Sequence, residues 1–463
     1  MANTIAQLKE VVGAANVLDG DDAKVRYGTD WTRFYQPKPL TVVLARDTEQ
    51  LVALVRFAAK QQLALVPSGG RTGLSGGAVA TNGEIVVSFE KMNRIVSFDA
   101  LEPSVTVEPG VVTATLQQYA LERGLYYPVD FASSGSSQIG GNIATNAGGI
   151  KVLKYGLTRD QVTGLKVVTG RGDLLNLNRG LVKNATGYDL RHLFIGSEGT
   201  LGFVVEATIR LTRPPVDPTV ILLGVPRMTD VIAILDKFRQ RVTPLAFEFF
   251  SNEALGCVLD QHSLPKPLAS DTDFYALLEF DRSHDGDLDN AMAAFEACVA
   301  DGLATDGVVS RSEAQRRELW KYREFISESI SRFTPYKNDI SVRVSRVPAL
   351  LEAVEAKVEA RYPEFQIIWF GHIGDGNVHL NVLKPESWTI DAFKAECEKV
   401  SDEVLAIVQS FDGSISAEHG VGLLKRDQLR FSRSAEEIEA MRAIKQVFDP
   451  HGIMNPGKLL SPS

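Results

Sequence analysis

The sequence predicts an α+β protein with a glycine-rich ligand-binding domain, a second domain carrying an antiparallel sheet with flanking helices, and a C-terminal helical segment. Strand-like and helix-like runs alternate along the whole chain. Of the 38 glycines, 22 lie within residues 69–202, where the backbone must need positive φ or close approach to a ligand. The proline-rich run 214–218 then reads as a linker. We expect domains at 1–213 and 219–410 and a segment 411–463 that completes the active site.

Composition limits the possible functions. The 463 residues suggest about three domains, and 44% hydrophobic with 23% charged residues is ordinary globular usage. A net charge of −9 argues against a nucleic-acid-binding surface. The three cysteines form no C-x-x-C, which fits a reducing compartment. Since no signal peptide and no spanning run of ~20 apolar residues is visible, we expect a cytoplasmic protein. Peripheral attachment to an inner membrane and a homodimer stay open.

Periodicity predicts the elements of the first domain. Asp47 is an N-cap with Gln50 at the capping-box position, so a helix is expected over 47–62, with Leu51, Leu54 and Val55 on one face. A second helix, 115–123, should stop at Gly124. Apolar, β-branched runs predict strands at 41–45, 63–67, 85–89, 104–110 and 201–211.

The rest of the chain predicts the second domain and the C-terminal segment. Strands are expected at 220–225 and 274–280, and helices at 230–240, 288–300 and 319–330. The last helix, 434–450, begins with a capping box of Ser434 and Glu437 and stops at Pro450.

The sharpest loop, P-S-G-G-R-T-G-L-S-G-G at 67–77, directly follows a predicted strand. Its glycines expose successive backbone amides that could grip a phosphate or pyrophosphate, although a tight structural turn is the alternative. It matches neither G-x-G-x-x-G nor a Walker A loop. The glycine- and amide-rich run 128–149 and the segment I-G-S-E-G-T-L-G at 195–202 add two further loops. Together they suit a long ligand with a diphosphate.

These three motifs resemble the FAD-linked oxidase family of the vanillyl-alcohol oxidase/p-cresol methylhydroxylase superfamily, over nearly the whole chain. The resemblance implies a two-part FAD-binding domain of that type. It also implies non-covalent FAD, because covalent members carry a histidine in the first loop, and here that loop has Arg71 and no histidine. The implied cofactor-binding residues are Pro67, Ser68, Gly69, Gly70, Arg71, Thr72, Gly73, Gly76, Gly77, Pro128, Asp130, Ser137, Gly140, Gly141, Asn142, Glu198, Gly202, Val204 and Asn455.

Three of the seven histidines lie in two compact motifs, F-G-H-I-G-D-G-N-V-H-L-N at 370–381 and S-A-E-H-G-V-G at 416–422. The G-D-G-N turn would fold two strands back and bring His372 and His379 together. With Glu418 they form the ligand set of an open catalytic zinc site. A hydrogen-bonded structural role is the alternative for each histidine taken alone.

The same motifs resemble the D-2-hydroxy acid dehydrogenases, a subfamily that includes D-lactate and D-2-hydroxyglutarate dehydrogenases. The resemblance implies a divalent metal, zinc by its ligands, on His372, His379 and Glu418, with His419 as the catalytic base. A metal would lower the hydroxyl pKa, an imidazole would take the proton, and flavin N5 would accept the hydride. Hydride and carbanion routes both remain open.

Substrate residues follow from the same resemblance. In the D-2-hydroxyglutarate dehydrogenases an Arg, a Thr and a Lys hold the distal carboxylate, and here Arg323, Ser327 and Lys337 stand at those places. Asn381 would contact the proximal carboxylate. Arg323 and Ser327, four residues apart, should share a helix face. For Arg323 and Lys337, a solvated charged face is the alternative.

The leading hypothesis is therefore FAD-dependent oxidation of D-2-hydroxyglutarate to 2-oxoglutarate, and the alternative is a D-lactate dehydrogenase or glycolate oxidase subunit. A zinc hydrolase that binds a nucleotide and a non-catalytic flavin-binding electron-transfer subunit are the rivals from other classes. No Fe–S cysteine motif is present, so electrons should leave to a separate acceptor such as electron-transfer flavoprotein or a quinone.

Overall fold

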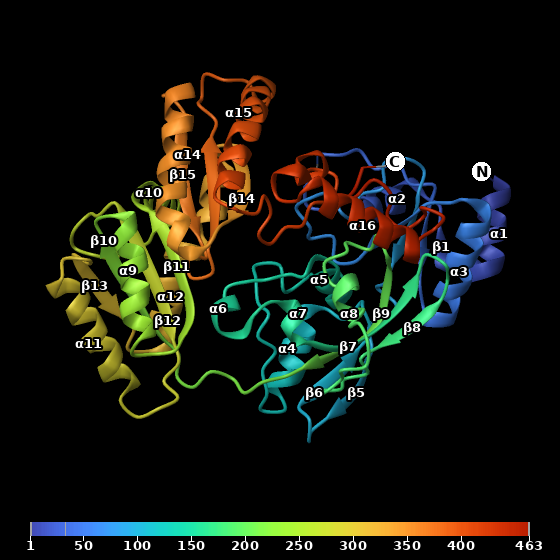
Figure 1. Cartoon of the computed structure of the whole chain (residues 1–463), viewed down its shortest axis with the longest axis horizontal. Coiled ribbons are helices and arrows are strands. Elements are labelled where there is room, and N and C mark those ends of the chain that lie inside the picture. Colours follow the sequence, from blue (N-terminus) through green and yellow to red (C-terminus); the bar gives the residue numbers. More distant parts are fainter. Residues whose placement is uncertain (1, 33, 462–463) are drawn as a thin grey trace. The chain divides into compact units, whose positions relative to one another are not determined.

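The computed structural model describes residues 2–32 and 34–461 and confirms the α+β class (Figure 1). The chain divides into two compact units. Unit 1 comprises Met1–Gly149, Gly156–Pro214 and Glu418–Ser463, and unit 2 comprises Ile150–Tyr155 and Pro215–Ala417. The change of unit after Pro214 falls beside the linker expected at 214–218. The short excursion 150–155 into unit 2 has no sequence signal that we recognised.

Unit 1 contains a four-stranded sheet of order β1-β2-β4-β3, in which β2, β4 and β3 are parallel and β1 is antiparallel to β2. Its strands are Val17–Leu18 (β1), Thr41–Leu44 (β2), Leu65–Ser68 (β3) and Ile85–Ser88 (β4). Every residue of β2 and β4 is buried, as parallel strands with both faces covered require. The predicted strands at 41–45, 63–67 and 85–89 are confirmed.

Helix α3 (Thr48–Gln61) covers this sheet and begins where the sequence predicted. The carboxylate of Asp47 accepts the backbone N–H of Gln50, which satisfies one orphan donor of the first turn. Its predicted apolar face, including Leu51, Leu54 and Val55, is buried in the core shared with the sheet.

A five-stranded antiparallel sheet of order β5-β6-β9-β7-β8 forms the second layer of unit 1. Its strands are Ile95–Asp99 (β5), Ser104–Val107 (β6), Val162–Thr169 (β7), Leu174–Leu177 (β8) and Gly202–Arg210 (β9). The predicted strands at 104–110 and 201–211 are β6 and β9. Strands β5, β7 and β8 were not predicted, because two of them are half-exposed and carry little apolar patterning.

The helices of unit 1 are short apart from α3 and the last one. They are Ala2–Val12 (α1), Asp21–Gly28 (α2), Thr113–Leu121 (α4), Ile139–Thr145 (α5), Thr158–Gln161 (α7), Arg191–Phe194 (α8) and Ala435–Phe448 (α16), with 3-10 turns at Ala14–Asn16 and Arg426–Phe431. The predicted capping box is present, since Ser434 and Glu437 exchange both hydrogen bonds.

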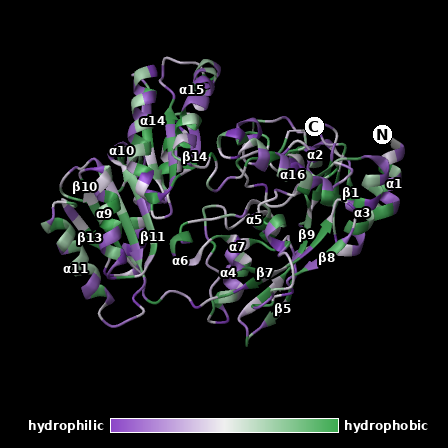
Figure 2. Cartoon of the chain, in the orientation of Figure 1, coloured by the Kyte–Doolittle hydropathy of each residue, from purple (hydrophilic) through white to green (hydrophobic). Residues whose placement is uncertain are grey.

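Unit 2 is built on a seven-stranded antiparallel sheet of order β13-β10-β12-β11-β15-β16-β14. Its strands are Thr219–Val225 (β10), Pro244–Ser251 (β11), Phe274–Phe280 (β12), Asp306–Val309 (β13), Tyr336–Ser341 (β14), Gln366–Gly371 (β15) and Asn377–Leu383 (β16). Figure 2 shows the hydrophobic colouring of central strands such as β11, whose residues are almost all buried. The antiparallel sheet is as predicted.

The helices of unit 2 flank this sheet. They are Val152–Tyr155 (α6), Met228–Arg239 (α9), Asn252–Gln261 (α10), Asp287–Ala300 (α11), Glu313–Glu324 (α12), Ile326–Ser331 (α13), Val347–Arg361 (α14) and Ile390–Ser410 (α15), with a 3-10 turn at Val344–Arg346. The prediction of one helix over 319–330 is wrong in that α12 ends at Glu324 and α13 begins after Phe325. Among the described residues, no helix is both long and apolar enough to cross a membrane.

Candidate active site

The first glycine loop begins at Ser68, the last residue of β3, whose hydroxyl donates to the backbone oxygen of Tyr27. Within the described chain, the amides of residues 69–73 donate no hydrogen bond to protein. Arg71 adopts a positive φ of 59°, turns back to the Gly69 oxygen and stacks over the Tyr27 ring at 4.9 Å. A run of unpartnered amides at the end of a strand fits a pyrophosphate.

The second loop lies against the first at Gly70. A side chain there would place its Cβ 2.3 Å from the Ser136 oxygen, so only glycine allows the two loops to pack this closely. The Gln138 side-chain oxygen is buried without a hydrogen-bond partner, about where a Cβ on Gly69 would point, and nothing lies within 4 Å of a Cβ on Gly141. An orphaned polar atom beside open space fits a bound polar cofactor.

Ser137 and Asn142, two of the predicted cofactor residues, are both hydrogen-bonded to Thr113. Thr113 was not predicted from the sequence. The Ser137 and Thr113 hydroxyls lie 2.7 Å apart, and the Asn142 amide donates to the same Thr113 oxygen at 2.7 Å. Gly140 lies against Pro109 and donates its amide to the Pro109 oxygen. Of the remaining members of the loop, Pro128 is buried, and Asp130 accepts a hydrogen bond from Gln117.

Glu198 connects the third glycine segment to the C-terminal residues of unit 1. Its buried carboxylate accepts the amides of Val421 and Gly422 at 2.7 and 2.8 Å. Burial raises the pKa of Glu198, and these two amides oppose the rise. Asn455 completes the connection by donating to the backbone oxygens of Gly77 and Glu198, while its own side-chain oxygen is buried without a partner.

The other predicted cofactor residues lie in tightly packed turns, in the sheet core or in the first loop. A Cβ on Gly76 would contact Tyr35 and Leu423, and one on Gly202 would lie 2.5 Å from the Val168 oxygen. Val204 lies in the core of the five-stranded sheet. In the first loop Thr72 is partly accessible and Gly73 is exposed.

Unit 2 holds the predicted histidine pair. His372 directly follows β15, His379 lies in β16, and the two rings are 5.4 Å apart and nearly perpendicular. The turn between them needs glycine at 376, where φ is 87° and a Cβ would lie 2.0 Å from the Val342 oxygen. The predicted strand–turn–strand arrangement, with both imidazoles brought together, is confirmed.

Each imidazole has a buried carboxylate at Nδ1. Glu248 Oε1 of β11 lies 2.7 Å from His372 Nδ1, and Asp339 Oδ1 of β14 lies 3.4 Å from His379 Nδ1. Burial lowers the pKa of His379, and Asp339 offsets part of that effect, so the neutral ring is favoured near pH 7. With Nδ1 turned to a carboxylate, Nε2 is the nitrogen that a metal would use.

Glu248 also contacts Arg323 of α12. Arg323 Nε lies 2.9 Å from Glu248 Oε2, close enough for an ion pair although the two atoms are not aligned for a hydrogen bond. Burial alone would raise the pKa of Glu248, but His372 and Arg323 outweigh it and the pKa is lowered, so the carboxylate stays charged. The Arg323 guanidinium also lies over the Phe370 ring at 4.8 Å.

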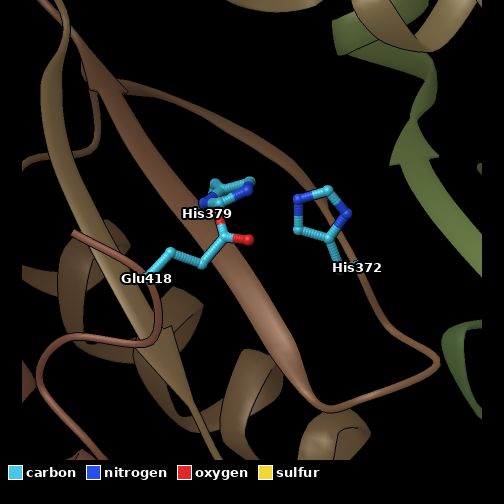
Figure 3. Close-up of side chains that lie close together, drawn as sticks. All are labelled: His372, His379 and Glu418. Atoms are coloured by element: carbon cyan, nitrogen blue, oxygen red, sulfur yellow. The ribbon is translucent and has the colours of Figure 1, made fainter. Parts of the chain in front are cut away.

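Glu418 completes the ligand set that the sequence predicted. Four residues before Glu418, Ser414 forms an antiparallel bridge with Ser341, the last residue of β14. Candidate ligand atoms of His372, His379 and Glu418 all lie within 4.8 Å of one another (Figure 3). Two imidazoles and a carboxylate fit zinc. The neighbouring His419 is half-buried, and its backbone oxygen accepts the Ser75 hydroxyl.

The predicted substrate residues occupy different environments. Arg323 is buried whereas Ser327, beyond the helix break, is exposed, so the expected common face does not form. Lys337 of β14 is exposed and stands directly opposite Asn381 of β16. Asn381 is buried, and its amide donates to the backbone oxygens of His379 and Ile368.

Sequence reading missed both carboxylate partners of the histidines. Glu248 interrupts the otherwise apolar strand L-A-F-E-F-F, and a lone charge in a buried strand marks a paired or functional group. Asp339 carried no comparable signal, because its strand mixes polar and apolar residues.

Comparison with known proteins agrees with the motifs. Residues 39–178 match the FAD binding domain family, and residues 215–459 match the C-terminal domain of FAD linked oxidases. The chain is 56% identical over 457 residues to a D-2-hydroxyglutarate dehydrogenase of Stutzerimonas stutzeri, covering 99% of this chain and 98% of that protein. It is 51% identical to one of Xanthomonas citri pv. viticola, covering 98% and 96%.

The fold is similar to that of a solved p-cresol methylhydroxylase with substrate bound. The TM-score is 0.76 at 15% identity, and the match covers 99% of this chain and 97% of that one. This confirms the expected vanillyl-alcohol oxidase/p-cresol methylhydroxylase fold. With family matches over both halves and relatives above 50% identity along the whole chain, this protein belongs to the FAD-linked oxidases and is an FAD-dependent oxidoreductase.

Proposed function

We propose that this protein oxidises D-2-hydroxyglutarate to 2-oxoglutarate, using non-covalent FAD and a divalent metal ion, with zinc as the ion that fits the ligand set. The observation that carries the proposal is the cluster of His372, His379 and Glu418 in a chain with an FAD-binding domain. The whole-length relatives named D-2-hydroxyglutarate dehydrogenase support the choice of substrate.

In this proposal the chain's own residues bind and orient the substrate and remove one proton. His372, His379 and Glu418 hold the metal, Lys337 and Arg323 attract the distal carboxylate, and Asn381 orients the proximal one. His419 accepts the hydroxyl proton. The carbon–hydrogen bond at Cα breaks, a carbon–oxygen double bond forms, and the bound FAD supplies the acceptor for the hydrogen and its electron pair while the metal supplies Lewis acidity.

The acidic net charge of −9 is compatible with an anionic substrate. A metal ion and two cationic side chains would supply positive charge locally, where short-range interactions dominate over the charge of the whole surface. Electrons would then pass to a separate acceptor, either an electron-transfer flavoprotein or a quinone.

One experiment tests the cofactor, the stereochemistry and the substrate class together. Purified yellow protein is mixed anaerobically with D- and L-2-hydroxyglutarate, D-malate and D-lactate while the flavin absorbance is followed. We expect D-2-hydroxyglutarate to bleach the flavin fastest and the L-isomers to leave it unchanged. Faster bleaching by D-lactate would replace the proposed substrate, and bleaching by none of these acids would refute the activity.

A further inference from the structure

Two arginine–carboxylate pairs join helix α12 to the same face of the seven-stranded sheet. Arg316 Nη1 lies 2.6 Å from Glu279 of β12, and Arg323 Nε lies 2.9 Å from Glu248 of β11. The arginines are seven residues apart, which is two helical turns, and the two glutamates are 0% and 1% exposed. The two glutamates are therefore similarly buried, and each faces an arginine of α12, although Arg316 is also bound by Glu313.

They differ in what the second carboxylate oxygen contacts. Glu279 Oε2 lies 3.6 Å from Lys151 Nζ, so among the described residues this carboxylate connects two cations and no histidine. Glu248 Oε1 instead lies 2.7 Å from Nδ1 of His372. Glu248 alone of the two links the arginine of α12 to a candidate metal ligand.

We propose that Glu248 is a positioning residue that sets metal affinity and substrate binding together, by orienting the His372 ring with one oxygen and the Arg323 guanidinium with the other. This inference rests on the proposed function for the role of Arg323, whereas the role at His372 depends only on the metal ligand set. In this proposal Glu248 contacts neither His372 Nε2, the nitrogen that would bind the metal, nor the substrate.

Geometry explains why one carboxylate can hold both groups. His372 follows the last residue of β15, whose Phe370 and Gly371 pair directly with Phe250 and Phe249 of β11. The His372 ring therefore lies beside β11, where Glu248 Oε1 is 2.7 Å from its Nδ1. A carboxylate at Nδ1 selects the Nδ1–H tautomer and directs Nε2 toward the ligand set.

The same carboxylate restricts the arginine. Arg323 comes from the last turn of α12, one residue before the helix ends. Its contacts with Glu248 and the Phe370 ring hold the guanidinium plane. Nε is the guanidinium nitrogen that lies 2.9 Å from Glu248, which leaves the two outer nitrogens to bind an anion.

The test compares Glu248→Gln and Glu248→Asp with the matched control Glu279→Gln in the FAD-loaded protein. Zinc affinity is measured by competition with a chromophoric chelator, and KM and kcat are measured for D-2-hydroxyglutarate. Thermal unfolding and retained yellow colour check the fold. The Asp variant keeps the charge but is too short to reach both partners, and it serves if the Gln variant does not fold.

We expect Glu248→Gln to weaken zinc binding by about 10- to 100-fold, the range for partners that orient metal ligands, and to raise KM more than it lowers kcat. Glu279→Gln should reduce thermal stability but leave zinc affinity within about threefold of wild type, because it touches no ligand. Glu248→Asp should fall between wild type and Glu248→Gln.

Wild-type zinc affinity in a folded Glu248 variant, or an equal loss in Glu279→Gln, would overturn the proposal. A protein that binds zinc as expected but oxidises no 2-hydroxy acid would refute the proposed function and leave the effect of Glu248 on zinc intact. The two failures are therefore distinguishable.

Discussion

The backbone N–H of Gly149 donates a hydrogen bond to Glu418 Oε1 at 3.2 Å, which joins the end of the second glycine loop to a candidate metal ligand. Gly149 has a φ of 131°, and a Cβ at this position would lie 2.1 Å from the Asp130 oxygen. The amide can reach Glu418 only because residue 149 is glycine.

Replacing Gly149 should therefore reduce both the stability of the fold and the affinity of the candidate metal site. We expect Gly149→Ala to reduce the free energy of unfolding by about 2 kcal/mol or more, from backbone strain and the clash with Asp130, and to weaken zinc binding because Glu418 loses a donor. Chemical denaturation and chelator competition measure the two effects. Gly135→Ala, in the same loop with nothing within 4 Å of its Cβ, should change neither; if it matches Gly149→Ala, the position-specific argument is wrong.

Loss of a metal ligand should separate chemistry from cofactor binding. We expect His372→Ala to reduce turnover of D-2-hydroxyglutarate to background while the protein stays yellow, because the FAD-binding loops belong to unit 1 and His372 to unit 2. Absorbance of the purified protein and steady-state rates measure this. The exposed His284 provides the control in His284→Ala. Full activity of His372→Ala, or of wild type after exhaustive chelation, would exclude a catalytic metal.

Lys337 offers a cleaner test of the distal-carboxylate contact than Arg323 does. Removing Arg323 would take one cationic partner from the buried Glu248 carboxylate, and the loss of one partner costs about 3–5 kcal/mol of stability in comparable buried pairs. Lys337 is exposed, so Lys337→Ala should leave stability unchanged. We expect its KM for D-2-hydroxyglutarate to rise about tenfold, with one lost charge–charge hydrogen bond, and its KM for D-lactate to stay the same. Equal effects on both acids would remove Lys337 from the substrate site.

Lys458 predicts a change of stability with pH. Its side chain is 2% exposed, its Nζ lies 3.9 Å from Glu84 Oε1, and burial lowers its pKa to about 8. Between pH 8 and the ordinary value of 10.5, the unfolded chain binds a proton that the folded protein has released, so this group makes the protein more stable as pH rises.

The gain from Lys458 should reach roughly 3.5 kcal/mol at most, at about 1.4 kcal/mol for a tenfold change in proton affinity. We expect Lys458→Met to unfold at higher denaturant than wild type at pH 7 and to lose the gain between pH 8 and 10. Urea denaturation at several pH values, with Lys60→Met on the exposed face of α3 as control, measures the difference. Parallel pH curves for Lys458→Met and wild type would contradict the assignment.

The sequence predicted the helices and strands that have a long apolar period or a helix-capping residue. Asp47 and Ser434 marked helix starts because a side-chain oxygen there satisfies an orphan amide, a rule that needs only neighbouring residues. Strands β5 and β8 and the helix break at Phe325 were not predicted, since short half-exposed strands carry little apolar period and the break occurs inside a run of helix-forming residues.

By itself the sequence determined the class of chemistry, because a glycine loop after a strand and histidines on either side of a G-D-G-N turn are local patterns whose residue types limit the ligand. Only the tertiary structure decided how those residues are held. Glu248 is 124 residues from His372, and Glu418 is 269 residues from Gly149, yet each pair is in hydrogen-bond contact. No local pattern encodes such pairs, because strand register and the path of the chain bring the two residues together. Once the charges are buried, each of them needs a partner.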